Sequence, residues 1–228
     1  MKSEVLRELP PKTENVRRVE LETEQRKLYL AAVVDAREKL RAAKPEDKMT
    51  VFAVLMRLRE ICCDPRLVAD NWTGSSAKLE ACLELVTEAV AGGHRILLFS
   101  QFTSMLELLA KRLDEAGVSH FTLQGSTPKP VRAEQVRRFN QGEADVFLIS
   151  LRAGGTGLNL TAADIVIHYD PWWNLAAQNQ ATDRAYRIGQ RNPVQVYRLI
   201  AQDTIEEKIV ELQQAKQSLA DTVTGGAD

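Results

Sequence analysis

The stretch RILLFS, residues 95–100, decides the fold class of this chain because it contains a short run of consecutive apolar residues. Such a run is typical of a strand that is buried on both faces in a parallel sheet. Four further segments are strand candidates: SHFTLQG (119–125), DVFLIS (145–150), DIVIHY (164–169) and VQVYRLI (194–200). Helical stretches lie between most of them. This alternation predicts an α/β fold with a parallel sheet flanked by helices.

The helices around these strands are predicted from apolar residues at helical spacing, and their ends from glycines and capping residues. The helix before residue 95 carries Leu79, Leu83, Val86 and Val90 and ends at Gly92-Gly93. Ser104 and Glu107 form a predicted capping box for the next helix, which runs to Gly117. We expect Thr204 and Glu207 to cap a last helix whose apolar positions are Ile205, Ile209, Leu212 and Leu219.

The first seventy residues differ in character from the α/β part. A Pro-Pro break at residues 10–11 favours an extended linker over residues 1–23. A helical appendage over residues 24–72 follows, with one helix from Gln25 to Ala43 and a second that ends near Asp64-Pro65. Their predicted apolar stripes are Leu28, Ala32, Ala36 and Leu40, then Val51, Leu55, Leu58 and Cys62. The α/β domain then spans residues 73–202, the last helix 203–222 and a frayed tail 223–228.

Composition excludes several classes of protein. The 228 residues carry a net charge of −1, which argues against a histone-like binder but leaves room for a local basic groove. The three cysteines, Cys62, Cys63 and Cys82, contain no C-x-x-C pair, so we expect neither a disulfide framework nor a metal site. No apolar run is long enough to cross a membrane, and the N-terminus does not resemble a signal peptide. We therefore expect an intracellular protein without a membrane partner.

The segment QATDRAYRIGQ, residues 180–190, places Arg184 and Arg187 three residues apart. On a helix this spacing puts both guanidinium groups on one face, where they would suit a phosphate. In isolation such a pair is more often a solvated helix surface, with Asp183 as an ion-pair partner.

The parts that hold Mg-ATP are missing from the sequence. A phosphate loop needs a Gly-Lys dipeptide, and this chain contains none. Asp114-Glu115 lies at the end of an amphipathic helix rather than after an apolar strand, so we interpret it as helix surface. The two arginines would then act on a phosphate held elsewhere, as arginine fingers do. Such a finger is worth a factor of ~10³–10⁵ in rate, or roughly 4–7 kcal/mol of barrier.

Longer motifs, in a fixed order, extend over nearly the whole chain. They are LREICCDP (58–65), ILLFSQFTSML (96–106), LQGSTPKPVRAEQVRRFN (123–140), ISLRAGGTGLNLTAADIVIHYDPWWN (149–174) and QATDRAYRIGQ. Together they resemble the second RecA-like lobe of Swi/Snf-type ATPases, the double-stranded-DNA translocases of helicase superfamily two. Residues 1–23 are similar to the linker between the two lobes, residues 24–72 to the helical protrusion, and 203–222 to the brace helix.

The resemblance implies one half of a longer enzyme. In that family the first lobe carries the phosphate loop and the acidic box, so ATP and Mg²⁺ would be held mainly there and none is expected on this chain alone. The implied partners are the first lobe of the same protein, double-stranded DNA and a DNA-bound protein substrate. The implied location is the cytoplasm or nucleoid of a prokaryote, or the nucleus of a eukaryote.

The resemblance also assigns roles to individual residues. Arg184 and Arg187 match the catalytic arginine fingers. The residues that match ATP-binding positions are Gln180, Gly155, Gly157 and Asn159. The residues that match DNA-binding positions are Gln101, Ser126, Thr127, Arg152 and Trp173, most of them directly after a strand, where open α/β sheets gather ligands. Core packing remains an alternative for Trp173 and is the favoured interpretation of Trp172. Tyr186 departs from the family, in which many members have histidine.

The basic residues of the 129–140 segment and the appendage allow other interpretations. Lys129, Arg132, Arg137 and Arg138 fit a solvated helix face, with Arg132 the best exception. The long amphipathic helices of residues 25–62 also support an alternative function, in which the chain is a non-catalytic module that docks a protein partner through an exposed apolar face. The competing interpretation is that this face packs on the rest of the chain.

Overall fold

The computed structural model describes residues 9–153 and 157–224, and its centre is one parallel sheet. The six strands lie in the order β1-β6-β5-β2-β4-β3, and each pairs in parallel with its neighbours. Their bounds are Lys12–Val19 for β1, Ile96–Ser100 for β2, His120–Leu123 for β3, Val146–Ser150 for β4, Ile165–His168 for β5 and Val194–Ala201 for β6. All five strand candidates of the sequence are confirmed, and so is the α/β fold.

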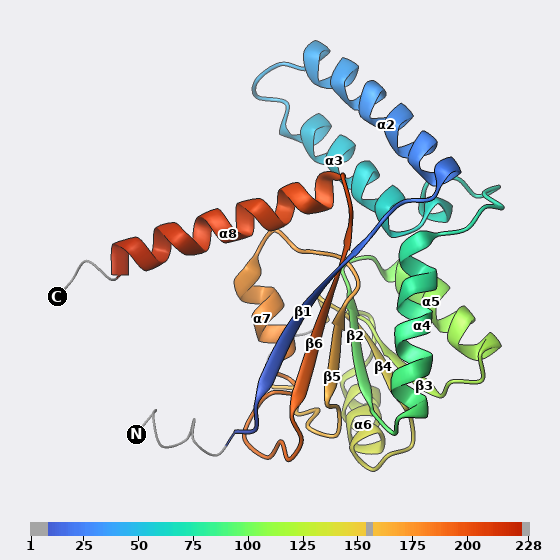
Figure 1. The fold of residues 1–228 in the computed structure, drawn as a ribbon, viewed down its shortest axis with the longest axis vertical. Coiled ribbons are helices and arrows are strands. Elements are labelled where there is room, and N and C mark those ends of the chain that lie inside the picture. Colours follow the sequence, from blue (N-terminus) through green and yellow to red (C-terminus); the bar gives the residue numbers. More distant parts are fainter. Residues whose placement is uncertain (1–8, 154–156, 225–228) are drawn as a thin grey trace.

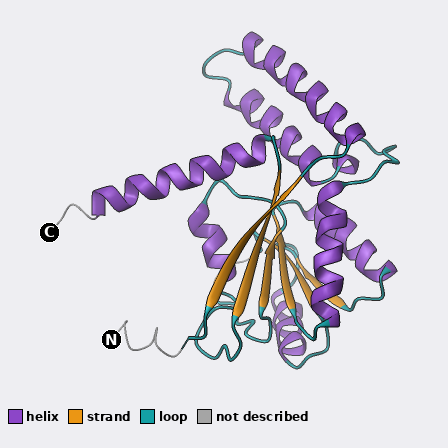
Figure 2. Cartoon of the chain, in the orientation of Figure 1, coloured by secondary structure: helices purple, strands orange, loops and turns teal. Residues whose placement is uncertain are grey.

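Helices cover both faces of this sheet, as the ribbon views show (Figure 1, Figure 2). Helices α4 (Ala77–Ala91) and α5 (Thr103–Glu115) pack on one face, where Ile96 and Leu98 of β2 join a buried cluster. Helices α6 (Lys129–Asn140) and α7 (Leu175–Thr182) cover the other, where Leu97 and Phe99 point into a second cluster. Burial on both faces explains why β2 consists of consecutive apolar residues rather than alternating ones.

The edge strand β1 comes from the segment that the sequence presents only as an extended linker. It pairs with β6 along its whole length, from Lys12 opposite Val194 to Val19 opposite Ala201. Its residues are almost all exposed, so it carries no apolar run of its own. Backbone pairing with β6, rather than side-chain burial, therefore holds this segment in place.

The appendage is a pair of helices, α2 (Thr23–Ala42) and α3 (Lys48–Cys63), followed by the short 3₁₀ helix η2 (Pro65–Leu67). Tyr29, Ala32 and Ala36 of α2 pack against Val54, Leu58 and Cys62 of α3 in a third buried cluster. The predicted stripes are correct near the body of the protein and wrong at the tip of the pair. Leu40 and Val51 are exposed there because both lie near the connection between the helices, beyond the cluster.

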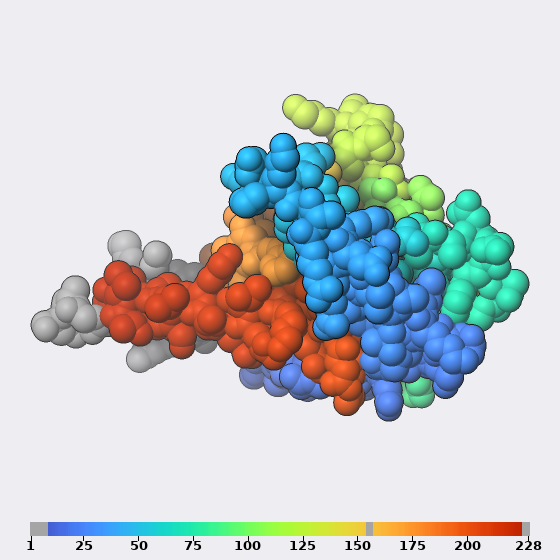
Figure 3. Space-filling view, turned by 90° about the horizontal axis from the view of Figure 1, so that it is seen from above, coloured from blue at the N-terminus to red at the C-terminus, as the bar shows by residue number. Residues whose placement is uncertain are grey.

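The last helix, α8 (Ile205–Thr224), begins against the appendage and then leaves the body of the protein (Figure 3). Its first turn is buried, with Ile209 fully covered, whereas residues 214–224 are exposed. Leu212 and Leu219 were expected on a buried stripe but are exposed. The buried residue at this point of α8 is Gln213, which bonds to Trp172 and Gln178, and Leu219 lies in the exposed stretch beyond it.

The two predicted helix caps differ in outcome. Helix α5 begins at Thr103, with Phe102 as its N-cap, so Ser104 already lies inside the first turn and the Ser104–Glu107 capping box is wrong. The Thr204 hydroxyl does accept a hydrogen bond from the Glu206 backbone N–H, 3.2 Å away, as a cap does. Glu207, however, forms an ion pair with Arg18 on β1 rather than completing a capping box.

Candidate functional site

The two arginines singled out by the sequence lie in turns and not on a helix. Helix α7 ends at Thr182, and the chain then runs through consecutive turns to Gln190. Gly189 has a φ of +101°, a conformation that side chains other than glycine rarely adopt, and it turns the chain toward β6. The expectation of a helical pair is therefore wrong, but Arg184 and Arg187 still line one cavity.

Hydrogen bonds join this arginine turn, residues 183–190, to the loop that precedes β5. The backbone N–H of Leu160 donates to the Arg184 carbonyl over 3.0 Å, and Arg187 Nη1 donates to the Leu158 carbonyl over 3.1 Å. Gln190 closes the turn from inside: its Nε2 donates to the Ala163 and Ala185 carbonyls over 2.8 and 3.0 Å. The arginines are thus held at the amino ends of β5 and β6.

A cavity of about 640 Å³ opens beside the turn and brings most of the predicted nucleotide residues together. Arg184, Arg187, Gln180, Gly157 and Asn159 all line it. Gly155 lies outside the described residues. Gly157 has a φ of +97°, so the predicted need for glycine at this position has a conformational cause. The remaining lining residues are Leu9, Lys12, Asp183, Tyr186 and Ile188.

The electrostatics of this cavity favour an anion. Arg184 is only 8% exposed, and burial, together with the nearby charge of Arg187, lowers the pKa of Arg184 from its usual value. An arginine remains charged at neutral pH even so. Burial also raises the pKa of Asp183, despite the opposing effect of Lys12 and the two arginines. The guanidinium groups therefore repel each other in a poorly solvated place, and a phosphate would relieve that repulsion.

Lys12 is a third cation of the cavity that the sequence did not single out. Its Nζ lies 5.2 Å from the centroid of the Tyr186 ring, within the range of a cation–π contact. Lys12 starts β1, and Tyr186 lies 174 positions later in the arginine turn. Only the pairing of β1 with β6 brings them together, so no local signal could have identified Lys12.

The predicted DNA-binding residues gather at the opposite, carboxyl edge of the sheet. Trp173 follows β5, Gln101 follows β2, Arg152 follows β4, and Ser126 and Thr127 follow β3. These four strands are neighbours in the sheet order, so the residues form a row across its edge. Arg152 and Ser126 are exposed, and Trp173 is half-buried.

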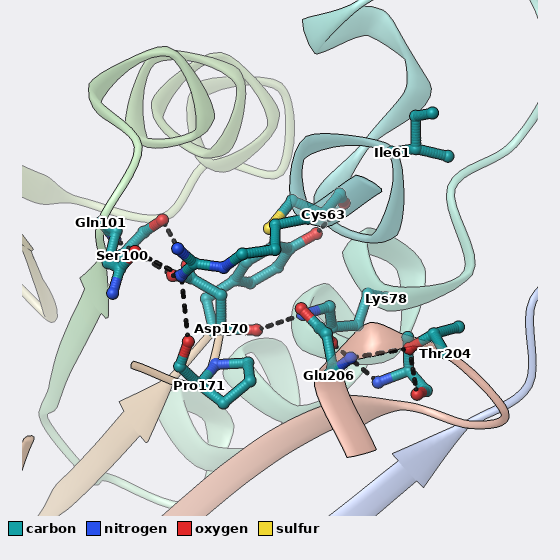
Figure 4. A network of polar contacts seen from close by, with 12 residues as sticks. Ile61, Cys63, Lys78, Ser100, Gln101, Asp170, Pro171, Thr204 and Glu206 are labelled. Carbon is teal, nitrogen blue, oxygen red and sulfur yellow. Dashed lines mark hydrogen bonds and ion pairs between the residues drawn. The ribbon is translucent and has the colours of Figure 1, made fainter. Parts of the chain in front are cut away.

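A buried arginine from the appendage reaches this edge, where Gln101, Asp170 and Pro171 lie close together (Figure 4). Arg59 of α3 is 3% exposed, and its Nη2 donates to Gln101 Oε1 and, over 3.1 Å, to the Pro171 carbonyl. Its guanidinium lies 4.0 Å from Asp170 and also stacks over Phe102 and Trp173. The sequence did not identify Arg59, because a charged residue within an amphipathic helix gives no sign of being buried.

The arginines of α6 fall into two groups, as expected: one contacts the protein and two lie on the surface. Arg132 Nη1 donates to the Ala153 carbonyl over 3.0 Å and so contacts the turn that follows β4. Arg137 and Arg138 form surface ion pairs with Glu134 and Glu143. Surface pairs of this kind contribute little free energy, which leaves Arg132 as the structural exception.

Trp172 packs against the same buried cluster as α7, which confirms the favoured interpretation of that residue. Asp114 and Glu115 are exposed at the end of α5, where Asp114 contacts His120 and Glu115 contacts Arg112. Among the described residues, no histidine, cysteine and carboxylate side chains gather into a group of three that could hold a metal ion. In that same part of the chain, none of the helices combines the length and apolar character needed to cross a membrane.

Family models match both the N-terminal part of the chain and the α/β part. Residues 77–189 match the family described as the helicase conserved C-terminal domain, and residues 1–67 match the SNF2-related domain. An uncharacterised ATP-dependent helicase of Mycoplasma pneumoniae is 40% identical over 219 residues, which are 96% of this chain and 21% of that protein. The chain spans between a fifth and a quarter of the length of the curated relatives it matches.

Two solved structures from Sulfolobus solfataricus have the same fold. One is the SWI2/SNF2 ATPase C-terminal domain, with a TM-score of 0.77 and 29% identity over 91% of this chain and 87% of that chain. The other is the SWI2/SNF2 ATPase core in complex with double-stranded DNA, with a TM-score of 0.81 and 30% identity over 99% of this chain and 48% of that chain. The chain therefore belongs to the Swi2/Snf2 family and is a C-terminal, RecA-like helicase lobe.

Proposed function

We propose that this chain is the second motor lobe of an ATP-dependent translocase that moves along double-stranded DNA. The observation that carries the proposal is the cavity beside the arginine turn, where Arg184, Arg187, Gln180, Gly157 and Asn159 line one space. Its cations and amide groups suit the phosphates of ATP, whereas the sequence has no phosphate loop to hold them. A first lobe would hold ATP and Mg²⁺, and this lobe would close on them.

In this proposal Arg184 and Arg187 neutralise the negative charge that grows on the transferred phosphoryl group. Such charge is stabilised best by donors that are already held in place. The backbone bond between Leu160 and Arg184 and the side-chain bonds of Gln190 hold the turn that carries both arginines. Arg187 would exchange its bond to the Leu158 carbonyl for a phosphate oxygen. Two guanidinium groups of this lobe would thus reach a phosphate that the first lobe holds.

The carboxyl edge is the proposed DNA track. The row formed by Trp173, Gln101, Arg152, Thr127 and Ser126 offers small polar groups, one cation and one aromatic ring. Such groups suit phosphates and make binding independent of base sequence and sensitive to salt. The related Sulfolobus ATPase core, which was solved with double-stranded DNA, supports this assignment. A nucleoprotein on that DNA would be the substrate of the whole enzyme.

The test is ATP turnover with and without duplex DNA, by this chain alone and after a first lobe has been added. We expect no turnover by the chain alone and DNA-stimulated turnover by the mixture. Arg187→Ala should abolish that turnover, whereas Arg37→Ala, on the exposed face of α2, should leave it unchanged. Normal turnover by the Arg187→Ala mixture would refute the finger assignment.

The alternative function, protein docking by the appendage, keeps one observation in its favour. The face that carries Ala32 and Ala36 packs against α3, so it is closed to a partner. Leu30 and Val34, on the other side of α2, are 52% and 56% exposed. A pulldown that fails with Leu30→Ser and Val34→Ser but survives Arg187→Ala would favour docking.

A further inference from the structure

Arg59 is buried where its charge must be compensated, and the oxygen acceptors of its guanidinium belong to the carboxyl edge, whereas Nη1 contacts the Met56 sulfur of its own helix. Asp170 is the nearby carboxylate, and its Oδ1 accepts a hydrogen bond from Ser100 Oγ over 2.5 Å while its Oδ2 accepts one from the Gln101 backbone N–H over 3.2 Å. Ser100 ends β2, residues 101–102 follow it, and residues 170–173 follow β5, the strand beside it. Arg59 therefore joins the appendage to two adjacent strand ends.

Both flanks of the Arg59 guanidinium are residues of the proposed DNA track. Its Nη2 donates to Gln101 Oε1, and its Cζ lies 6.0 Å from the centroid of the Trp173 ring. The bond to the Pro171 carbonyl fixes the backbone that leads into Trp173. A guanidinium is planar and rigid, so one side chain can set the positions of both neighbours at once.

The contact also decides which way the Gln101 amide faces. A guanidinium can only donate hydrogen bonds, so the amide oxygen must face Arg59 and the amino group must face away. That Nε2 amino group is buried, although Gln101 as a whole is half-buried, and it has no hydrogen-bond partner among the described residues. A buried donor without an acceptor is costly, and a phosphate oxygen brought to this edge would satisfy it.

We propose that Arg59 is a positioning residue of the DNA track, which turns Gln101 into a donor for a backbone phosphate. This inference rests on the proposed function, because it needs duplex DNA at the carboxyl edge. It adds to that function a residue from the appendage, outside the row of strand ends. It also gives the appendage a role in DNA binding without any contact between Arg59 and DNA.

The test measures the affinity for a short duplex at low salt, with the first lobe present, together with the melting temperature of each variant. Gln101→Glu keeps an acceptor for Arg59 but has no amino group and brings a negative charge. We expect it to melt at or above the wild-type temperature and to lose roughly tenfold or more in affinity, the size of one charge-assisted hydrogen bond. A purely structural role would not separate the two measurements in this way.

Arg59→Met, Gln101→Met and the double variant form a cycle that tests the coupling. Because Arg59 acts through Gln101, the affinity of the double variant for DNA should be almost the same as that of the single variant that binds DNA less tightly. Arg57→Met is the matched control, since Arg57 is an exposed arginine of the same helix and its loss removes the same charge. We expect Arg57→Met to bind almost as the wild type does.

The outcomes separate the two proposals. A wild-type protein that does not bind the duplex even at low salt would refute the proposed DNA track, and this inference with it. Wild-type binding that Gln101→Glu leaves unchanged would refute the role of Arg59 and Gln101 alone. If the losses of DNA affinity in the two single variants multiply in the double variant, the proposed role is also refuted, because Arg59 would then act by its own charge and not through Gln101. If Arg59→Met fails to fold, the Gln101→Glu result still decides.

Discussion

Lys78 and Glu206 form a fully buried ion pair, in which Lys78 Nζ lies 2.7 Å from both carboxylate oxygens. The pair links α4 to the first turn of α8, 128 positions later in the chain. Further bonds satisfy both groups: Lys78 donates to the Tyr169 carbonyl over 2.7 Å, and Glu206 accepts from the Ala201 backbone N–H over 2.8 Å. Burial is the largest single effect and opposes the charge on Lys78, but the Glu206 carboxylate and other nearby groups, Asp170 among them, together raise the pKa of Lys78 above its ordinary value.

Replacing one member of this pair should destabilise the lobe strongly. Lys78→Met leaves the Glu206 carboxylate buried without a counter-charge, and we expect a loss of about 3–5 kcal/mol in the free energy of unfolding. Urea unfolding measures it. The double variant Lys78→Met, Glu206→Gln should recover a large part of that loss, because no unpaired charge is left at this position. A double variant less stable than Lys78→Met would contradict this explanation.

The buried His168 should make the lobe sensitive to acid. Burial lowers the pKa of His168 from 6.5 to about 3 in the folded chain. Above pH 6.5 the side chain is neutral in both states and contributes no pH dependence. Between pH 6.5 and 3 only the unfolded chain takes up the proton, so stability falls as the pH falls, by up to about 1.4 kcal/mol per unit.

His168→Gln removes this titration while it keeps a polar group for the Thr182 hydroxyl, which lies 2.9 Å from His168 Nε2. The measurement is the free energy of unfolding of both proteins between pH 8 and pH 4. We expect the two curves to run parallel above pH 7 and the wild-type curve to fall more steeply below pH 6.5. Parallel curves over the whole range would show that His168 does not titrate as described.

Gly157 should tolerate no side chain, although the space beside it is open. An added Cβ would meet no atom within 4 Å, but the φ of +97° disfavours any residue other than glycine. We expect Gly157→Ala to cost about 1–3 kcal/mol, the range for a strained backbone position. The control is Gly125→Ala, which has equally open space and no positive φ. Equal melting temperatures for the two variants would contradict the conformational explanation.

Lys12 should contribute to nucleotide binding in the reassembled motor. It lines the arginine cavity and adds a third positive charge beside Arg184 and Arg187. Lys12→Met should raise the KM for ATP roughly tenfold, the value of one charge-assisted hydrogen bond, and change kcat less than Arg187→Ala does. Lys208→Met, at an exposed position of α8, serves as the control. An unchanged KM would remove Lys12 from the site.

Much of the fold could be predicted from the sequence because its signals are local. RILLFS, DVFLIS and DIVIHY contain consecutive apolar residues, SHFTLQG and VQVYRLI alternate apolar with polar ones, and each of the five became a strand of the sheet. The helix of residues 77–91 has its apolar residues at helical spacing, and Leu79 and Val86 are fully buried. The placement of Gln101, Arg152 and Trp173 at one edge also followed, because the strands of a parallel sheet end on the same side.

The site was predicted in part. Arg184, Arg187, Gln180, Gly157 and Asn159 line one cavity, although the helical spacing expected for the arginines was wrong. A spacing of three residues between two arginines looks the same in the sequence whether the chain between them forms a helix or a series of turns. The bonds of Gln190 to Ala163 and Ala185 make the difference, and Ala163 lies 27 positions away.

By itself, the sequence determined the strands and most of the helices, since each depends on neighbours within a few positions. It also indicated the family, through motifs in a fixed order, and that resemblance supplied the predicted residues of the two proposed binding sites. Only the tertiary structure decided that β1 joins the sheet, that Lys12 meets the arginine turn and that Arg59, Lys78 and Glu206 are buried. A charged side chain can be buried only where distant segments bring it a partner of opposite charge and hydrogen bonds. Periodicity along the chain contains no information about such partners, because they belong to segments that meet only after folding.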